Sequence, residues 1–385
     1  MPWQLQKNGE EGASLIDWLY YGVAALLATL LLTAALLPAA QPLGLVDRPG
    51  GRKDHGRPIP VIGGVAIILV TVVMACLTIE DSAALLAFVI ASLLLLLVGV
   101  LDDMHDLRWF WRIGAQAAAA LIMIYVGGVR VEQIGPLFGM EPMALGSLSV
   151  PFTVFATVGL INAVNMVDGI DGLAGSLVIA ALLMLGCAAA YSGNDAQLPL
   201  IAILVGSLSG FLFFNLRRPG RERALTFMGN GGSAFLGFVI AWFSFRLTQN
   251  PGHPVSPVLA PFLILLPLLD CLVLIVRRLK SGRSPFTADR GHLHHRLLDA
   301  GFSQGQAVAL LLGLSFAAGL AAALLLKWNL PHPFFVLGFI GLFVLHYWAT
   351  ACALRSERVF RWLHARLFGP YFAQSVEPAK QDSVL

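Results

Sequence analysis

The sequence predicts an all-α polytopic membrane protein, and three observations support this fold class. Of the 385 residues, 57% are hydrophobic and only 12% are charged, and the mean hydropathy is +0.78. Apolar stretches of roughly 17 to 25 residues, the length that crosses a bilayer, recur along the chain. Polar clusters and Pro/Gly runs separate these stretches. The composition excludes a soluble domain, and no zinc-finger spacing indicates binding of nucleic acid.

About eleven transmembrane helices are predicted from these stretches. The first follows Glu10 and Glu11 instead of a basic region and is too long for the core of a signal peptide, so we expect a retained span. Residues 127–150 contain Gly, Pro and alternating apolar residues, which predicts a small extracytoplasmic β-hairpin. The predicted helices cover residues 16–40, 60–79, 83–101, 109–126, 150–164, 174–191, 197–216, 232–248, 258–276, 306–326 and 333–353.

The distribution of Lys and Arg predicts the orientation. With eleven helices, 21 of the 25 basic residues fall on one side of the membrane. The positive-inside rule places that side in the cytoplasm. Residues 1–15 are then an extracytoplasmic segment, residues 16–353 the transmembrane domain and residues 354–385 a cytoplasmic basic tail. Arg217, Arg218, Arg221 and Arg223 are interpreted as topology determinants attracted to anionic lipid.

Four polar segments interrupt the apolar chain, and the same helix count places all of them on the cytoplasmic side. Ionisable groups at membrane depth are costly and usually functional, so we expect these segments to meet in one cytoplasmic cleft. They are Asp102-Asp103, the stretch NAVNMVDGIDGLAG at residues 162–175, TFMGNGGS around Phe227 and Asn230, and the histidine cluster at residues 292–295.

Two of these segments carry paired acids. Asp102 and Asp103 repel each other, so their pairing makes sense if a cation or a substrate proton is handled there. Asp168 and Asp171 are three residues apart and would share one face of a helix. Each precedes a glycine, which permits close approach of a phosphate to backbone N–H groups. A polar turn between spans is the alternative, but it does not explain two acids without a basic partner in the loop.

The other polar segments suggest anion binding. Phe227 offers a flat face to a base, and the adjacent glycines allow a phosphate nest. Clustered histidines suggest zinc, but no further ligands with metal-site spacing accompany them, so charge-assisted hydrogen bonds to a diphosphate are favoured over metal or a purely structural loop. Lys53, in the basic loop after the first helix, could steer a lipid phosphate or act as a topology signal alone. The histidine segment contains Arg290, His292, His294 and His295.

Five motifs, in this order, resemble those of the polyprenyl-phosphate N-acetylhexosamine-1-phosphate transferases (glycosyltransferase family 4). They are LVDRPGGRKDHGRPIPVIGG, GVLDD, NAVNMVDGIDGLAG, FMGNGGS and SPFTADRGHLHH, and they extend from about Leu45 to Ala307. The chain is most similar to the WecA/TagO-like branch, the undecaprenyl-phosphate GlcNAc-1-phosphate transferases, which start O-antigen, common-antigen or teichoic-acid synthesis.

The resemblance implies a reaction in the bacterial cytoplasmic (inner) membrane. Undecaprenyl phosphate would attack the sugar-bearing phosphorus of a UDP-N-acetylhexosamine, with UDP-GlcNAc as the first choice, and UMP would be released. Mg²⁺, or Mn²⁺ as a substitute, would be the cofactor. A homodimer is a further expectation from the family, and another UDP-N-acetylhexosamine is the alternative donor.

The resemblance also implies roles for the residues within its motifs. Asp102 and Asp103 would lie at the acceptor phosphate and the metal, with Asp102 as one candidate base. Asn165 and Asp168 would contact the nucleotide side, and Asp171 would support the site. The remaining substrate-binding positions would be Phe227 at the uracil, His292, His294 and His295 at the diphosphate or sugar, and Lys53 and Arg290.

The chain departs from the family pattern at one metal position. The pattern FMGD supplies a magnesium ligand, whereas this chain has Asn230, so Asp102, Asp103 and Asn230 form the expected metal set. Asparagine lacks the negative charge that Mg²⁺ prefers, which predicts weaker metal binding or low activity. A non-catalytic binding protein is the alternative reading. A lipid phosphate with a second pKa of about 6 is largely dianionic at neutral pH, so base catalysis by Asp102 is not required, and a two-step route stays open.

Overall fold

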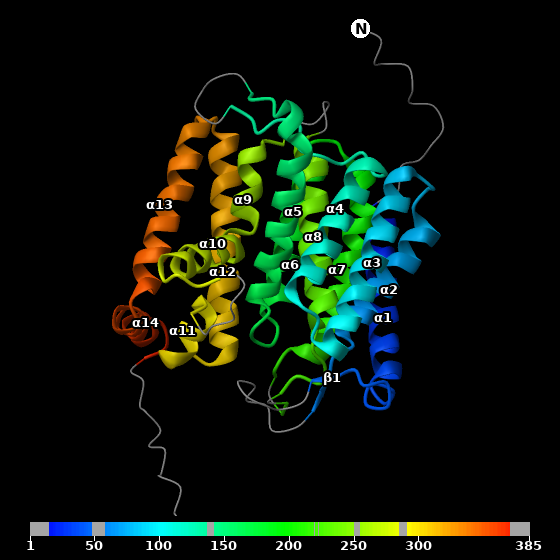
Figure 1. Ribbon diagram of the computed structural model, residues 1–385, viewed down its shortest axis with the longest axis horizontal. Helices are drawn as coiled ribbons and strands as arrows, with labels where there is room; N and C mark the ends of the chain where they lie inside the picture. The colour runs from blue at the N-terminus through cyan, green and yellow to red at the C-terminus, as the bar shows by residue number, and fades with distance from the viewer. Residues whose placement is uncertain are drawn as a thin grey trace, which may run out of the picture.

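The computed structural model is a bundle of α-helices with one pair of very short strands (Figure 1). It describes residues 15–47, 58–136, 142–218, 220–221, 223–249, 255–284 and 291–369. The helices are α1 (Leu15–Leu36), α2 (Gly63–Thr78), α3 (Ala83–His105), α4 (Trp109–Tyr125), α5 (Ser149–Val167), α6 (Leu173–Tyr191), α7 (Leu198–Asn215), α8 (Gly229–Thr248), α9 (Ala260–Leu263), α10 (Leu265–Lys280), α11 (Leu293–Asp299), α12 (Gln304–Lys327), α13 (His332–Ala351) and α14 (Ala353–Phe368). Short 3₁₀ turns precede α5, α7 and α9 at Gly146–Leu148, Asp195–Gln197 and Pro257–Leu259.

The prediction of an all-α polytopic membrane protein is confirmed. Within the described residues, eight helices are long and apolar enough to cross a membrane, and the count is nine if α9 and α10 form one span. A count of eleven is not established. The two predicted spans that fall short are α2 and α4, with 16 and 17 residues. At 1.5 Å per residue they reach only about 24 to 26 Å, less than the roughly 30 Å of a typical hydrocarbon core.

The predicted single helix over residues 258–276 is instead two helices bent by 83° between Leu263 and Leu265. Proline explains the break, because Pro267 has no N–H to donate to the carbonyl of Leu263 and its ring would clash with that carbonyl. Ile264 at the bend accordingly leaves helical geometry, with φ −125° and ψ 34°. Hydropathy alone does not register this break, since both halves are apolar.

The region predicted as an extracytoplasmic hairpin contains antiparallel contacts but no named strand. Gln133 and Ala144 form an isolated antiparallel bridge, and the N–H of Leu145 donates to the carbonyl of Glu132 at 2.8 Å. Residues 137–141 lie outside the described part of the chain. The two named strands occur elsewhere, in β1 (Val46–Asp47) and β2 (Ile59–Pro60), where Asp47 pairs with Ile59.

Helix α8 is the centre of the bundle, and most of its residues are buried. Its aromatic side chains surround Phe88 of α3; the ring of Trp242 lies 5.4 Å from that of Phe88. Near its N-terminus the backbones almost touch, since a Cβ on Gly99 of α3 would lie 2.0 Å from the Cα of Gly231. Glycine at these positions therefore lets α3 bring its terminal acids against the start of α8.

The C-terminal part of the chain forms a smaller packed unit. A second apolar cluster joins residues of α6, α11 and α12 to Phe360 of α14. Helix α14 lies within the predicted basic tail, so the segment that follows α13 is ordered as a helix through Phe368. Figure 1 shows α11 and α14 at the same end of the bundle as β1. This packing positions the histidine segment, which begins α11.

Candidate active site

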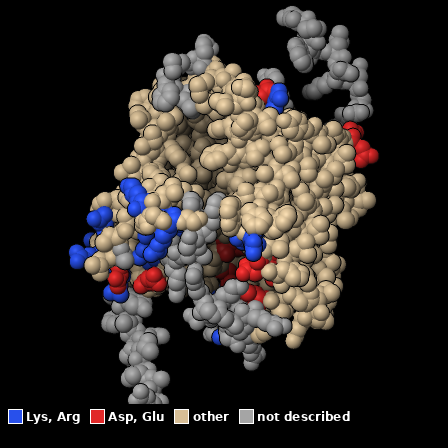
Figure 2. Space-filling model, in the orientation of Figure 1, with Lys and Arg blue, Asp and Glu red and all other residues tan. Residues whose placement is uncertain are grey.

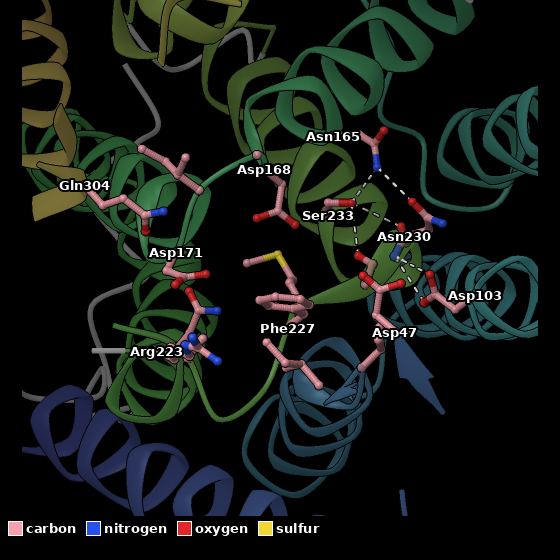
Figure 3. Close-up of a pocket in the computed structure, with 18 of the residues that line it drawn as sticks. Asp47, Asp103, Asn165, Asp168, Asp171, Arg223, Phe227, Asn230, Ser233 and Gln304 are labelled. Carbon is pink, nitrogen blue, oxygen red and sulfur yellow. Dashed lines mark hydrogen bonds between the residues drawn. The ribbon is translucent and has the colours of Figure 1, made fainter. Parts of the chain in front are cut away.

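A cavity of about 1130 Å³ opens at the end of the bundle where α3, α5 and α7 end and α6 and α8 begin. Figure 2 shows acidic side chains gathered in this hollow. Figure 3 shows the labelled residues around the cavity, with Phe227 near its centre. All four predicted polar segments contribute to its wall, so the expectation that they meet is confirmed. Their contributions are Asp102, Asp103, Asn165, Asp168, Asp171, Phe227, Asn230 and His295.

The carboxylate of Asp103 is fixed on the N-terminus of α8. The backbone N–H of Asn230 donates to both of its oxygens at 3.1 Å, which satisfies a donor that the helix leaves unpaired. Gly229 makes this contact possible: its φ is +77°, and a Cβ there would lie 2.5 Å from Oδ2 of Asp103. The glycine of the FMG motif is therefore explained by the close approach of Asp103 from α3.

The side chain of Asn230 belongs to a polar network between α5 and α8. The Asn165 amide donates to Oγ of Ser233 at 2.8 Å and to Oδ1 of Asn230 at 3.4 Å. Figure 3 shows these bonds beside Asp103. A carboxylate at position 230 would accept from the same amide, so the network suits either asparagine or aspartate.

Asp168 and Asp171 differ in their partners. Oδ2 of Asp171 accepts from Nε of Arg217 at 2.6 Å. Among the described residues the carboxylate of Asp168 has neither a hydrogen-bond nor an ion-pair partner, although the residue lies in the cavity wall. Burial, together with the negative charges of Asp171 and Asp103, raises the pKa of Asp168 to about 7. A positive charge beside this carboxylate would therefore stabilise its ionised form.

Asp102 is buried and already engaged. Its Oδ1 accepts from the N–H of Leu107 at 2.9 Å, and its Oδ2 lies 3.4 Å from Nη1 of Arg112. It lines both the large cavity and a neighbouring one of about 430 Å³. Asn165, Asn230 and His295 line both cavities as well. These shared residues therefore lie between the two cavities, which adjoin each other.

The backbone of Phe227 is held by hydrogen bonds to the segment that leads into α2. Its N–H donates to the carbonyl of Pro60 at 2.8 Å, and its carbonyl accepts from Gly63 at 3.0 Å. Asn215, buried at the end of α7, fastens the segment around Phe227 to the acidic loop. Its Nδ2 donates to the carbonyl of Thr226 at 2.9 Å, and its Oδ1 accepts from the N–H of Gly172 at 2.7 Å.

The histidines divide between the two cavities. His292 and His294 line only the smaller cavity, whereas His295 lines both. His294 packs against the acidic loop so closely that a Cβ on Gly169 would lie 2.2 Å from its Nε2. Burial lowers the pKa of His294 to about 3, with the neighbouring histidines adding to the effect, so its ring is neutral at pH 7. Such a ring can hydrogen-bond but cannot supply positive charge.

Two predicted substrate-binding residues, Lys53 and Arg290, lie outside the described residues. Sequence reasoning also missed several residues. Arg217 and Arg223 were interpreted as topology determinants, yet Arg217 pairs with Asp171 and both line the large cavity. Asp47 and Asn215 line it too. Asn215 had a usable signal, a lone amide at the end of an apolar run.

The described residues contain no cluster of three or more His, Cys, Asp or Glu side chains in a ready-made metal geometry. The donor chemistry nevertheless fits a hard divalent cation, which prefers carboxylate and carbonyl oxygens. Asp168 lacks a partner, and Asp103 and the Asn230 carbonyl line the same cavity. A bound cation would offset the burial and the repulsion from Asp171 and Asp103 that together raise the pKa of Asp168.

Comparisons with known proteins agree with these motifs. The model for glycosyl transferase family 4 matches residues 85–248. A Haemophilus influenzae protein named undecaprenyl-phosphate alpha-N-acetylglucosaminyl 1-phosphate transferase is 33% identical over 337 residues, covering 88% of this chain and 94% of its own. Proteins of the same name from Pasteurella multocida (35% identical; 89% of this chain and 95% of the relative) and Escherichia coli K12 (33%; 84% and 88%) also match. The chain therefore belongs to glycosyl transferase family 4, as its five ordered motifs predict.

Proposed function

We propose that this protein transfers GlcNAc-1-phosphate from UDP-GlcNAc to undecaprenyl phosphate and releases UMP. The observation that carries the proposal is the pair of adjoining cavities, which share Asp102, Asn165, Gly169, Asn230 and His295. A transfer between a nucleotide sugar and a lipid phosphate needs two binding spaces that meet at the reacting phosphorus. The names of the relatives at 33 to 35% identity support this choice of donor sugar and acceptor.

The larger cavity suits the nucleotide sugar. At about 1130 Å³ it exceeds the usual size of a small-ligand pocket and can hold a nucleoside diphosphate with its sugar. Phe227 offers a ring for stacking of the base, and Arg217 and Arg223 supply positive charge for the diphosphate. Because the same wall carries several aspartates, positive charge from a cation would also be needed for tight binding of an anion.

The smaller cavity suits the acceptor phosphate. Its lining combines apolar side chains such as Leu95 and Ile113 with Arg112 and Arg278. An arginine pair beside apolar side chains fits a phosphate at the head of a long hydrocarbon chain. Arg112 is 3.4 Å from Asp102 and 39% exposed, so it can turn from that loose ion pair to an entering phosphate.

The reaction follows from this arrangement. An oxygen of the lipid phosphate attacks the sugar-bearing phosphorus, the bond from that phosphorus to the bridging oxygen breaks, and the electron pair leaves with UMP. A dianionic phosphate needs no base, so the residues contribute mainly by positioning and by balancing charge. Asp102, which lines both cavities, would orient Arg112 and the attacking phosphate.

A magnesium ion is part of the proposal. Asp103, Asp168 and Asn230 would hold it, and it would neutralise the diphosphate as charge develops on the leaving group. Asp102 was expected among the ligands, but its bonds to Leu107 and Arg112 favour a role at the acceptor. The substitution of asparagine for aspartate at 230 predicts a raised magnesium requirement.

The proposed setting is the bacterial inner membrane, with both cavities facing the cytoplasm and residues 1–15 outside. The excess of basic residues on the cavity side supports this orientation. A homodimer stays a prediction from the family resemblance.

The test is release of UMP from membranes supplied with undecaprenyl phosphate, UDP-GlcNAc and Mg²⁺. We expect release that depends on all three additions and is abolished by Asp168→Asn. The matched control is Asp195→Asn, which makes the same change at a carboxylate in the loop between α6 and α7. The proposal fails if neither the protein nor its Asn230→Asp variant releases UMP with UDP-GlcNAc. Release with a different UDP-N-acetylhexosamine alone would retain the chemistry and replace the sugar.

A further inference from the structure

A buried acid outside the predicted motifs connects three helices behind the histidine segment. Asp270 lies in α10 and is only 3% exposed. A carboxylate at such a depth is costly unless donors surround it. Two donors hydrogen-bond to it, Nδ1 of His292 at 2.9 Å and the N–H of Leu293 at 3.0 Å. Nε2 of His346 in α13 lies 3.4 Å from its Oδ1, at ion-pair distance but without a hydrogen bond.

The contact with His292 determines which ring nitrogen faces a ligand. Because Nδ1 donates to the carboxylate, Nε2 is the nitrogen left for other partners, and it has no hydrogen bond within the described structure. His292 lines the smaller cavity. An imidazole whose Nδ1–H is held by a carboxylate has a fixed orientation and a defined tautomer.

The neighbouring histidine provides an internal comparison. His294 stacks on His292 at a ring separation of 5.3 Å and is also buried. Among the described residues its Nε2 has no hydrogen-bond partner, and no carboxylate forms an ion pair with its ring. Of the two stacked histidines, Asp270 therefore hydrogen-bonds only to His292, whose segment it also anchors through the N–H of Leu293.

We propose that Asp270 is a positioning residue that acts through His292, fixing its orientation and tautomer toward the acceptor phosphate in the smaller cavity, while His346 holds Asp270 from α13. The inference rests on the proposed function for its kinetic consequence. The orientation and tautomer of the ring can be measured without turnover.

The experiment uses the full chain in detergent, with ¹⁵N-labelled histidine and the His292→Gln variant to assign the ring signals. In the wild type we expect His292 to carry its proton on Nδ1. Asp270→Asn should change these signals and lower kcat about 10- to 100-fold, the cost seen when the carboxylate partner of a metal-bound histidine is removed. KM for UDP-GlcNAc should change less than about threefold, because Asp270 and His292 do not line the larger cavity.

The matched control is Asp299→Asn, which makes the same change at an exposed carboxylate of α11 and should leave ring signals and turnover unchanged. The double variant Asp270→Asn/His292→Gln should be no slower than His292→Gln alone. The proposal would be overturned by any of three results. These are additive losses of kcat in the double variant, unchanged His292 ring signals in Asp270→Asn, and altered ring signals with wild-type turnover in Asp270→Asn. If Asp270→Asn does not fold, unchanged His292 signals in His346→Gln would overturn it. Absence of turnover in the wild type would refute the proposed function, while the ring signals would still test the positioning.

Discussion

The ionisation of Asp168 should make the metal-free protein less stable as the pH rises. Burial and the charges of Asp171 and Asp103 raise the pKa of Asp168 to about 7 in the folded state. A raised pKa means that the folded protein holds the proton more tightly than the unfolded chain does. The stabilising contribution is therefore complete at low pH and is lost as the pH rises through the folded pKa.

The size of the effect follows from the two pKa values. With a model value of 3.8 for the unfolded chain and about 7 for the folded state, ionisation of Asp168 removes about 2 kcal/mol of unfolding free energy between pH 5 and pH 7. This figure is an upper bound, because the side chain is only partly buried and solvent screens its neighbours.

The assay is equilibrium unfolding in mixed micelles with a chelator, on the wild type and on Asp168→Asn, whose amide does not titrate. Other groups titrate in both proteins, so the difference between the two curves isolates Asp168. We expect the wild type to lose stability relative to the variant from pH 5 to pH 7, and added Mg²⁺ to reverse this loss. A difference that is constant across this range would refute the assignment of Asp168 as an uncompensated carboxylate.

Three further predictions test other parts of the site. Asn230→Asp should lower the Mg²⁺ concentration for half-maximal UMP release about tenfold or more, because Mg²⁺ prefers a carboxylate to a neutral carbonyl; identical magnesium titrations would show that position 230 does not hold the ion. Gly229→Ala should cost about 1–3 kcal/mol of stability and reduce UMP release. Gly128→Ala, at a position with a positive φ but no neighbour within 4 Å, should affect stability alone. An equal loss of UMP release in both variants would contradict the contact between Gly229 and Asp103. His294 has a pKa of about 3 in the folded state, below its ordinary value of 6.5, so its stabilising contribution should be lost as the pH falls below 6.5. The unfolding free energy of His294→Asn should lack this loss between pH 7 and pH 5. The same pH dependence in the wild type and the variant would count against burial of a neutral ring.

Much of the site could be predicted because its chemistry contrasts with the apolar chain. Asp102-Asp103 and Asp168/Asp171 stand out as costly groups between spans, and the parity of the helices placed them on one side. The helix boundaries followed from hydropathy for the same reason. Each prediction used a local contrast that is visible in one short stretch of sequence.

The features that sequence reasoning missed depend on partners far away in the chain. Arg217 follows an apolar run and has the features of a topology signal, and only folding brings it to Asp171, 46 residues earlier. Asp270 is a lone acid in an apolar run, a signal that was present, but its role depends on His292 and on His346 of α13. The bend at Ile264 depends on Pro267 within a uniformly apolar stretch, where hydropathy changes little.

The central claim is that sugar and phosphate move together from the nucleotide to the lipid. The most direct measurement supplies the membrane-bound protein with undecaprenyl phosphate, Mg²⁺ and UDP-GlcNAc labelled with ³²P in the sugar-bearing phosphate. We expect the label to enter the organic phase as a diphosphate-linked lipid while an equal amount of unlabelled UMP is released. Label that leaves in UDP, with only the sugar reaching the lipid, would contradict attack at phosphorus and with it the proposed use of the two cavities.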